Sequence, residues 1–122
     1  MGPSPVVVIV DDDPAVCGSL KFFLELEGFG VRAYGSAADL LKAGELTACD
    51  CFVIDQRMPE MNGMELIAKL RDLHVWTPAI LLVSHSNPAV TARAAKAEIP
   101  IVEKPLFGNP LVDKIREACG QN

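Results

Sequence analysis

Short apolar runs alternate with helix-like segments along the chain, and this alternation limits the fold more than any other feature. Strands are expected at 6–10, 31–34, 51–55, 79–83 and 99–102. The run at 79–83 is apolar throughout, which is typical of a strand covered on both faces. Because each strand is followed by a helical segment and short connections, the pattern predicts a parallel sheet with helices on both faces.

Local signals indicate where several helices begin and end. Asp13 before Pro14 combines an N-cap residue with a proline at the first helical position, and residues 87–88 repeat this arrangement. Ser36 and Asp39 have the spacing of a capping box. Helix ends are expected near three glycines: Gly28, Gly44 and Gly120.

The spacing of apolar residues predicts which side chains are buried. The helix after Asn87 has Val90 as its only large apolar residue, so we expect it to be short and weakly held. Pro100 lies inside the last expected strand and cannot donate a ladder hydrogen bond, which predicts an edge strand. Residues expected to point inward are Met64, Ile67, Leu70 and Leu73 of the third helix, and Leu111, Val112 and Ile115 of the last.

Composition restricts the class of protein. A length of 122 residues suits a single domain over 1–122, with 1–5 as an N-terminal tail and no output domain. A net charge of −5 argues against direct nucleic-acid binding. The chain lacks an apolar run of membrane-spanning length and a signal peptide, so we expect a cytoplasmic protein. The four cysteines lack the spacing of a zinc site and are expected to be small buried thiols, with a redox role as the alternative.

Acidic residues follow two of the expected strands directly. Asp11, Asp12 and Asp13 come after the first strand, and Asp55 ends the third. Carboxylates at this density repel one another, and the ends of parallel strands meet at the ligand-binding edge of an α/β sheet. Hard oxygen ligands favour Mg²⁺ or Ca²⁺. The sequence therefore predicts a divalent cation site at this edge.

Two further strand ends add a hydroxyl and an ammonium group to the same edge. Ser84 follows the fourth expected strand and Lys104 follows the fifth. A cation and a lysine can offset the charge of a phosphoryl group, while a carboxylate such as that of Asp55 can accept the group as an acyl phosphate. These residue types together indicate phosphoryl-transfer chemistry.

The chain resembles the receiver domain of two-component response regulators over essentially its whole length. The matching segments are 10–14, Ile54-Asp55 with Arg57-Met58-Pro59 and Asn62-Gly63, Ser84, and Lys104-Pro105. The resemblance implies a flavodoxin-like (βα)5 doubly wound fold with a five-stranded parallel sheet in the order 2-1-3-4-5. It also implies that the chain is a phosphorylation-controlled switch rather than an enzyme, apart from self-catalysed phosphorylation and dephosphorylation.

Roles for single residues follow from the resemblance. Asp55 would accept phosphate from a histidine kinase or a histidine phosphotransfer protein. Mg²⁺ would be bound by Asp12, Asp55 and the backbone carbonyl of Arg57, with Asp11 acting through water. Asp13 matches a variable position and is interpreted as a helix cap.

The remaining implied roles concern the phosphorylated state. Lys104 would contact the phosphate, its bond to Pro105 would be cis, and Ser84 stands at the switch Ser/Thr position. The signal would pass to a downstream protein or a detached output domain. The face formed by the fourth helix, fifth strand and fifth helix is a candidate for homodimerisation.

Departures from the family leave two other functions open. His85 stands where receivers have a small residue, and Ile101 stands where they often have Tyr or Phe. These departures suggest a pseudo-receiver, an interaction module that signals without phosphate. A small phosphatase with Asp55 as nucleophile is the other alternative, but Arg57 stands where that class places its general acid-base residue.

Overall fold

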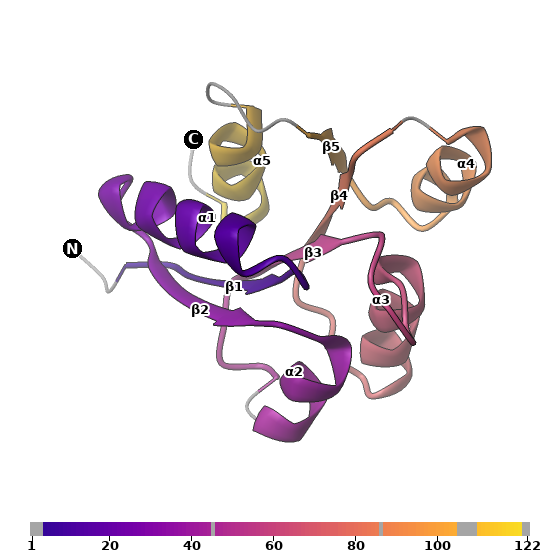
Figure 1. The fold of residues 1–122 in the computed structure, drawn as a ribbon, viewed down its shortest axis with the longest axis horizontal. Helices are drawn as coiled ribbons and strands as arrows, with labels where there is room; N and C mark the ends of the chain where they lie inside the picture. Colours follow the sequence, from indigo (N-terminus) through magenta and orange to yellow (C-terminus); the bar gives the residue numbers. More distant parts are fainter. Residues whose placement is uncertain (1–3, 45, 86, 105–109, 121–122) are drawn as a thin grey trace.

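The computed structural model describes residues 4–44, 46–85, 87–104 and 110–120. Strands and helices alternate along these ranges, as the sequence predicts (Figure 1). The strands are β1 (Val6–Val10), β2 (Gly30–Tyr34), β3 (Cys51–Asp55), β4 (Ala79–Val83) and β5 (Ile101–Glu103). The helices are α1 (Pro14–Leu26), α2 (Ala37–Ala43), α3 (Gly63–Asp72), α4 (Pro88–Lys96) and α5 (Pro110–Ala118).

All neighbouring strands are parallel, and the sheet order is β2-β1-β3-β4-β5. This order confirms the predicted (βα)5 fold. The register pairs Val10 with Ile54 and Val83 with Glu103. The residues that follow each pair, at or just beyond the strand ends, therefore lie side by side. The predicted site residues after β1, β3, β4 and β5 are therefore brought to one edge of the sheet.

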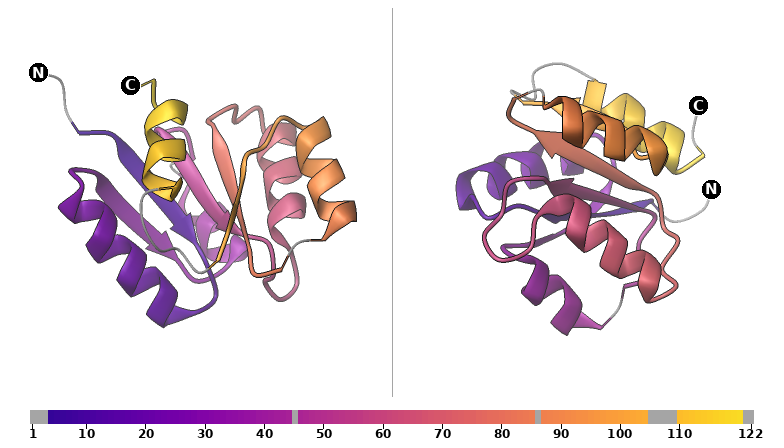
Figure 2. Two further views of the ribbon diagram at one scale, coloured as in Figure 1. Left: turned by 90° about the horizontal axis from the view of Figure 1, so that it is seen from above. Right: turned by 90° about the vertical axis from the view of Figure 1, so that its right-hand side faces the viewer.

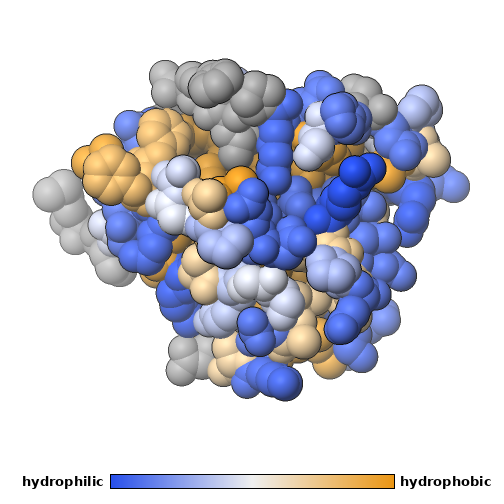
Figure 3. Space-filling model, in the orientation of Figure 1, coloured by the Kyte–Doolittle hydropathy of each residue, from blue (hydrophilic) through white to orange (hydrophobic). Residues whose placement is uncertain are grey.

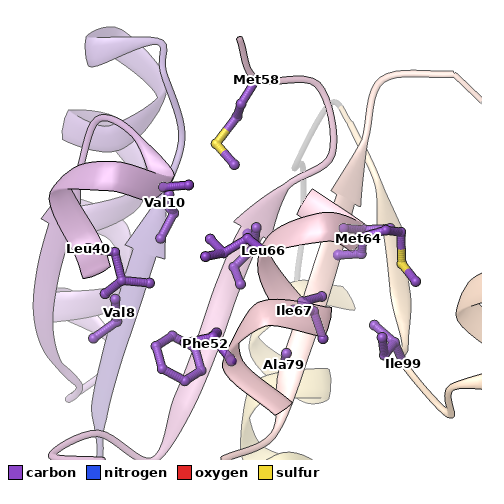
Figure 4. Close-up of a cluster of buried hydrophobic side chains, with 14 of the residues drawn as sticks. Val8, Val10, Leu40, Phe52, Met58, Met64, Leu66, Ile67, Ala79 and Ile99 are labelled. Atoms are coloured by element: carbon purple, nitrogen blue, oxygen red, sulfur yellow. The ribbon is translucent and has the colours of Figure 1, made fainter. Parts of the chain in front are cut away.

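Alternate strand residues face opposite sides of the sheet and form two apolar cores. Val8, Phe52 and Leu81 pack with α2, α3 and α4, whereas Ile9 and Val53 pack with α1 and α5. Figure 2 shows the sheet between these helix layers, with α4 beside α3, and Figure 4 shows the first core. The period of two in the side-chain direction explains why the central strands are apolar on both faces.

The expected helix starts are present. Asp13 accepts a hydrogen bond from the N–H of Ala15 at 2.9 Å, and the Ser36 hydroxyl accepts one from the N–H of Asp39 at 3.0 Å. Asn87 caps α4 in the same way. Each cap satisfies a backbone donor that the helix itself cannot use.

The predictions for β2, β5 and Leu73 differ from the structure. β2 begins at Gly30 rather than at residue 31. β5 covers Ile101–Glu103 rather than 99–102, so Pro100 lies before the strand, where its carbonyl accepts a hydrogen bond from the N–H of Leu81. β5 is nonetheless at the sheet edge, as predicted. Leu73 was predicted to point inward, but it is the C-cap residue of α3 and 46% exposed, whereas Leu66 is buried. α3 ends at Asp72, one residue before Leu73, so Leu73 does not continue the apolar stripe.

α4 is short and weakly packed, as its composition predicts. Of the residues of α4, all of which are described, only Ala94 is buried, and Val90 is half-buried. The apolar surface visible in Figure 3 gathers over α1, where Phe22 and Leu26 are exposed. Within the ranges that the structure describes, no helix has the length and apolar character needed to cross a membrane.

Gly63, the first residue of α3, lies against the end of β3. A Cβ atom at this position would be 2.7 Å from the carbonyl oxygen of Asp55 and 2.6 Å from Cδ1 of Leu81. Gly18, in the middle of α1, is exposed, and a Cβ atom there would meet nothing within 4 Å. The close approach of β3 therefore requires glycine at position 63, whereas position 18 has room for a side chain.

We expect Gly63→Ala to lower the free energy of unfolding by about 1–3 kcal/mol, because the added methyl group overpacks a rigid contact. Gly18→Ala is the matched control and should raise it by about 0.5–1 kcal/mol, since alanine favours a helix interior. Urea unfolding followed by circular dichroism measures both changes. A Gly63→Ala protein as stable as the Gly18→Ala protein would contradict the close approach of α3 to β3.

Candidate functional site

Three aspartates form an acidic group at the carboxyl edge of the sheet. One carboxylate oxygen from each of Asp11, Asp12 and Asp55 lies within 4.8 Å of the others. Asp11 and Asp12 follow β1, and Asp55 is the last residue of β3, the neighbouring strand. The parallel register places them together, as predicted.

Lys104 joins two of these carboxylates. Its Nζ donates to Oδ2 of Asp11 at 3.0 Å and lies 3.1 Å from Oδ1 of Asp55. Asp11 is 1% exposed and Asp55 4%, so both negative charges are compensated away from bulk water. The N–H of Lys104 donates to the carbonyl of Val83 at 2.7 Å, which fixes the lysine at the end of β5.

Asp11 and Asp12 differ in the access that they offer. The second oxygen of Asp11, Oδ1, accepts a hydrogen bond from the N–H of Asp13 at 3.0 Å, so both of its oxygens are engaged. Asp12 is exposed. Three carboxylates against one ammonium leave an excess of negative charge, and their hard oxygen atoms suit Mg²⁺. The residues therefore fit a divalent cation, with Asp12 open to direct contact.

The charges in this group shift two pKa values. Burial raises the pKa of Asp55; the hydrogen bond from Lys104 opposes this rise, and repulsion from Asp11 and Asp12 adds to it. Burial alone would lower the pKa of Lys104, but its hydrogen bonds to Asp11 and Asp55 outweigh that effect and raise the pKa above the usual value. Without a cation, the ionised form of Asp55 is therefore less favourable than in water.

A pocket of about 340 Å³ lies beside the aspartates, between the β3–α3 and β4–α4 connections. Ser84 and His85 line it from one side, and Arg57 and Asn62 line it from the other. Ser84 and His85 are both exposed. Ser84, the predicted switch residue, therefore lines an open pocket next to the connection that follows Asp55, and His85 follows it in the chain.

The remaining predicted positions fall into two groups. Ile101 is half-buried and packs against the core on the α2, α3 and α4 side. Pro105 and the predicted cis bond to it lie outside the described residues.

Sequence reasoning did not single out Gln56, whose side chain accepts a hydrogen bond from the N–H of Met64 at 2.9 Å. No pattern pointed to Gln56, because a contact across a loop depends on how the loop folds.

Similarity to known proteins identifies the family. The family model named response regulator receiver domain matches residues 7–116. The chain belongs to this family. Receiver domains are in general phosphorylation-controlled regulatory switches. The resemblance described from the sequence is confirmed.

Relatives of this receiver domain are response regulators. The transcriptional regulatory protein FixJ of Rhizobium meliloti (strain 1021) is 34% identical over 113 residues, which cover 92% of this chain and 55% of FixJ. The response regulator protein TmoT of Ectopseudomonas mendocina is 35% identical over 114 residues, which cover 93% of this chain and 52% of TmoT. The chain thus spans about half the length of these curated relatives.

Solved structures agree with this assignment. The structure of FixJ-N is 33% identical to this receiver domain, with a TM-score of 0.83, and the match covers 98% of this chain and 94% of that one. A response regulator receiver domain protein from Clostridium thermocellum has a TM-score of 0.88 at 22% identity, over 95% of this chain and 94% of its own. At that identity the likeness shows the fold alone.

Asp55→Asn should raise the melting temperature at neutral pH in Mg²⁺-free buffer. Because the pKa of Asp55 is higher in the folded than in the unfolded protein, its ionisation lowers stability. The loss of stability is absent below the pKa that Asp55 has in the unfolded protein and complete above the pKa that it has in the folded protein. Asparagine cannot ionise, so Asp55→Asn removes this loss at neutral pH.

Thermal unfolding in EDTA, followed by circular dichroism, checks this expectation. Asp13→Asn is the control, because it also removes one negative charge at this end of the sheet, while asparagine still caps α1. The increase should be larger for Asp55→Asn. A melting temperature that is unchanged or lower in Asp55→Asn would show that ionised Asp55 does not destabilise the fold.

Proposed function

We propose that this receiver domain accepts a phosphoryl group on Asp55 in an Mg²⁺-dependent reaction and acts as a switch toward a partner protein. The observation that carries the proposal is the 3.1 Å contact between Lys104 Nζ and Asp55 Oδ1, inside a group of three aspartates. This supports the proposal, because the Asp55 carboxylate, the Lys104 ammonium group and further carboxylate oxygens lie close together at one edge of the sheet.

The proposed Mg²⁺ ligands are Asp12, Asp55 and the backbone carbonyl of Arg57, with Asp11 acting through water. The exposure of Asp12 and the engagement of both oxygens of Asp11 support this division. When bound, the ion would offset the negative charge of the aspartates and of the incoming phosphoryl group.

The phosphoryl donor that fits this site is a phosphohistidine of a histidine kinase or a histidine phosphotransfer protein. A carboxylate oxygen of Asp55 attacks the phosphorus, and the new O–P bond forms as the P–N bond breaks. The imidazole leaves with the electron pair of the broken bond. Lys104, already next to Asp55, balances charge on the phosphoryl oxygens, and the Ser84 hydroxyl can donate a hydrogen bond to one of them.

The proposed output is a change of shape that a partner reads, not turnover of an external substrate. Phosphorylation removes charge from the Asp55 oxygen that Lys104 contacts, so Lys104 would turn toward the phosphoryl group. α4, with its single buried residue, and β5, one of the two edge strands, are weakly restrained elements that such a change could move.

The proposed partners include a reader of the phosphorylated state and a second copy of the chain. A downstream protein or a separate output domain is proposed to read the phosphorylated state. The face of α4, β5 and α5 is proposed for homodimerisation. A cytoplasmic location is proposed because phosphohistidine donors for receivers act there.

A pseudo-receiver that signals without phosphate is the second candidate. The half-buried, aliphatic Ile101 favours it, because isoleucine offers no aromatic hydroxyl to follow the switch serine. Asp11, Asp55 and Lys104, which contact one another, favour the phosphorylated switch.

Incubation with acetyl phosphate and Mg²⁺ should increase the intact mass by one phosphoryl group. The gain should require Mg²⁺ and disappear in Asp55→Asn, while the matched variant Asp13→Asn should still be phosphorylated. Intact-protein mass spectrometry of parallel reactions, one with Mg²⁺ and one with EDTA in its place, measures this. A gain that persists in Asp55→Asn would exclude Asp55 as the acceptor. No gain in folded wild-type protein would favour the pseudo-receiver.

A further inference from the structure

The first turn of α3 has all of its backbone donors bound by protein groups. The N–H of Asn62 donates to Oε1 of Glu65, and the N–H of Glu65 donates to Oδ1 of Asn62, each at 2.9 Å. The N–H of Gly63 donates to the carbonyl of Gln56 at 3.0 Å, and the N–H of Met64 donates to Oε1 of Gln56 at 2.9 Å. Gln56 therefore binds two of the four donors that a helix start leaves unsatisfied.

Gln56 also connects α3 to the sheet. It directly follows Asp55, and its own N–H donates to the carbonyl of Leu82 in β4 at 2.9 Å. One residue thus makes three hydrogen bonds to two elements through its N–H, its carbonyl and its side chain. A backbone N–H can only donate, so the oxygen of the Gln56 amide is the atom that faces Met64.

These contacts close the loop of residues 57–61 at its base. The loop leaves the sheet at Gln56, and the first helical residues return to that same residue. Within it, the N–H of Met61 donates to the carbonyl of Pro59 at 2.8 Å, and Glu60 adopts a left-handed backbone with φ 69°. Met58 is buried, and Figure 4 shows it pointing from the loop toward the core.

Arg57, the residue next to Gln56, belongs to this closed loop. Under the proposed function its backbone carbonyl is an Mg²⁺ ligand, and a carbonyl ligand has no side-chain torsion with which to adjust its position. Its placement depends on the backbone on either side. The main chain of Gln56 fixes the backbone before Arg57. The side-chain amide of Gln56 holds the start of α3, at which the loop after Arg57 ends.

We propose that Gln56 is a positioning residue for the metal and phosphoryl site, holding the Arg57 carbonyl in place through its side-chain bond to Met64. This inference rests on the proposed function, because it concerns the same Mg²⁺ site. Groups that orient metal ligands through hydrogen bonds commonly change metal affinity by about 10-fold or more when they are removed.

Gln56→Met tests the role of the amide oxygen. Methionine has a similar length and volume but offers the N–H of Met64 no amide oxygen. We expect the dissociation constant for Mg²⁺, measured by isothermal titration calorimetry, to rise by about 10-fold. The rate of phosphorylation by acetyl phosphate at subsaturating Mg²⁺ should fall with it and recover when Mg²⁺ is raised.

Two further variants separate positioning from simple helix capping. Gln56→Glu keeps an oxygen acceptor for Met64 at the same reach, so Mg²⁺ should bind at least as tightly as in the wild type. Ser36→Ala removes a first-turn cap from α2. This helix follows the edge strand β2, which β1 and β3 separate from β4. The Ser36→Ala variant should lower the urea midpoint as Gln56→Met does, yet leave Mg²⁺ affinity unchanged.

The outcomes are distinct. Weaker Mg²⁺ binding in Gln56→Met, but not in Gln56→Glu or Ser36→Ala, supports positioning. If the methionine variant does not fold, Gln56→Asn, whose side chain is one methylene shorter, provides the same comparison. Wild-type Mg²⁺ affinity in a folded Gln56→Met protein overturns the inference and leaves the proposed function intact. A wild-type protein that binds no Mg²⁺ overturns the proposed metal site and this inference together.

Discussion

The contact of the Lys104 ammonium with Asp11 and Asp55 is the interaction on which the rest of the site depends. A parallel sheet with this register must bring the ends of β1 and β3 together, and both ends carry nearly buried carboxylates. Their repulsion would oppose the strand pairing that creates the edge. Lys104 follows β5, which lies on the opposite side of β4 from β3. Its ammonium group compensates both charges and makes the acidic edge compatible with a folded sheet.

The fold was largely predictable because its signals are local and repeated. Apolar runs gave the strands, and Asp13, Ser36 and Asn87 marked helix starts that the structure confirms. The errors occur at the ends of elements, because a periodic pattern does not show the residue at which a strand or helix stops. Pro100 was placed inside the last strand, but it lies before it, and Leu73 continues the helical spacing in the sequence although α3 has already ended.

The site was predictable to the extent that strand ends determine it. The gathering of Asp11, Asp12, Asp55 and Lys104 follows from the order and register of the strands. The contact of Gln56 with α3 does not, because it depends on a loop whose path is fixed by a buried methionine and a helix start. No period or motif in the sequence carries that information.

The saturated first turn of α3 has a consequence for how charge is balanced at the acceptor. Helix starts commonly serve as anion sites because their N–H groups are free, but here Gln56, Asn62 and Glu65 already occupy them. A phosphoryl group on Asp55 would thus gain little from the nearest helix. Under the proposed function, its charge would be balanced by Lys104, the Ser84 hydroxyl and a dissociable ion, and the supply of that ion would be a second input to the proposed switch.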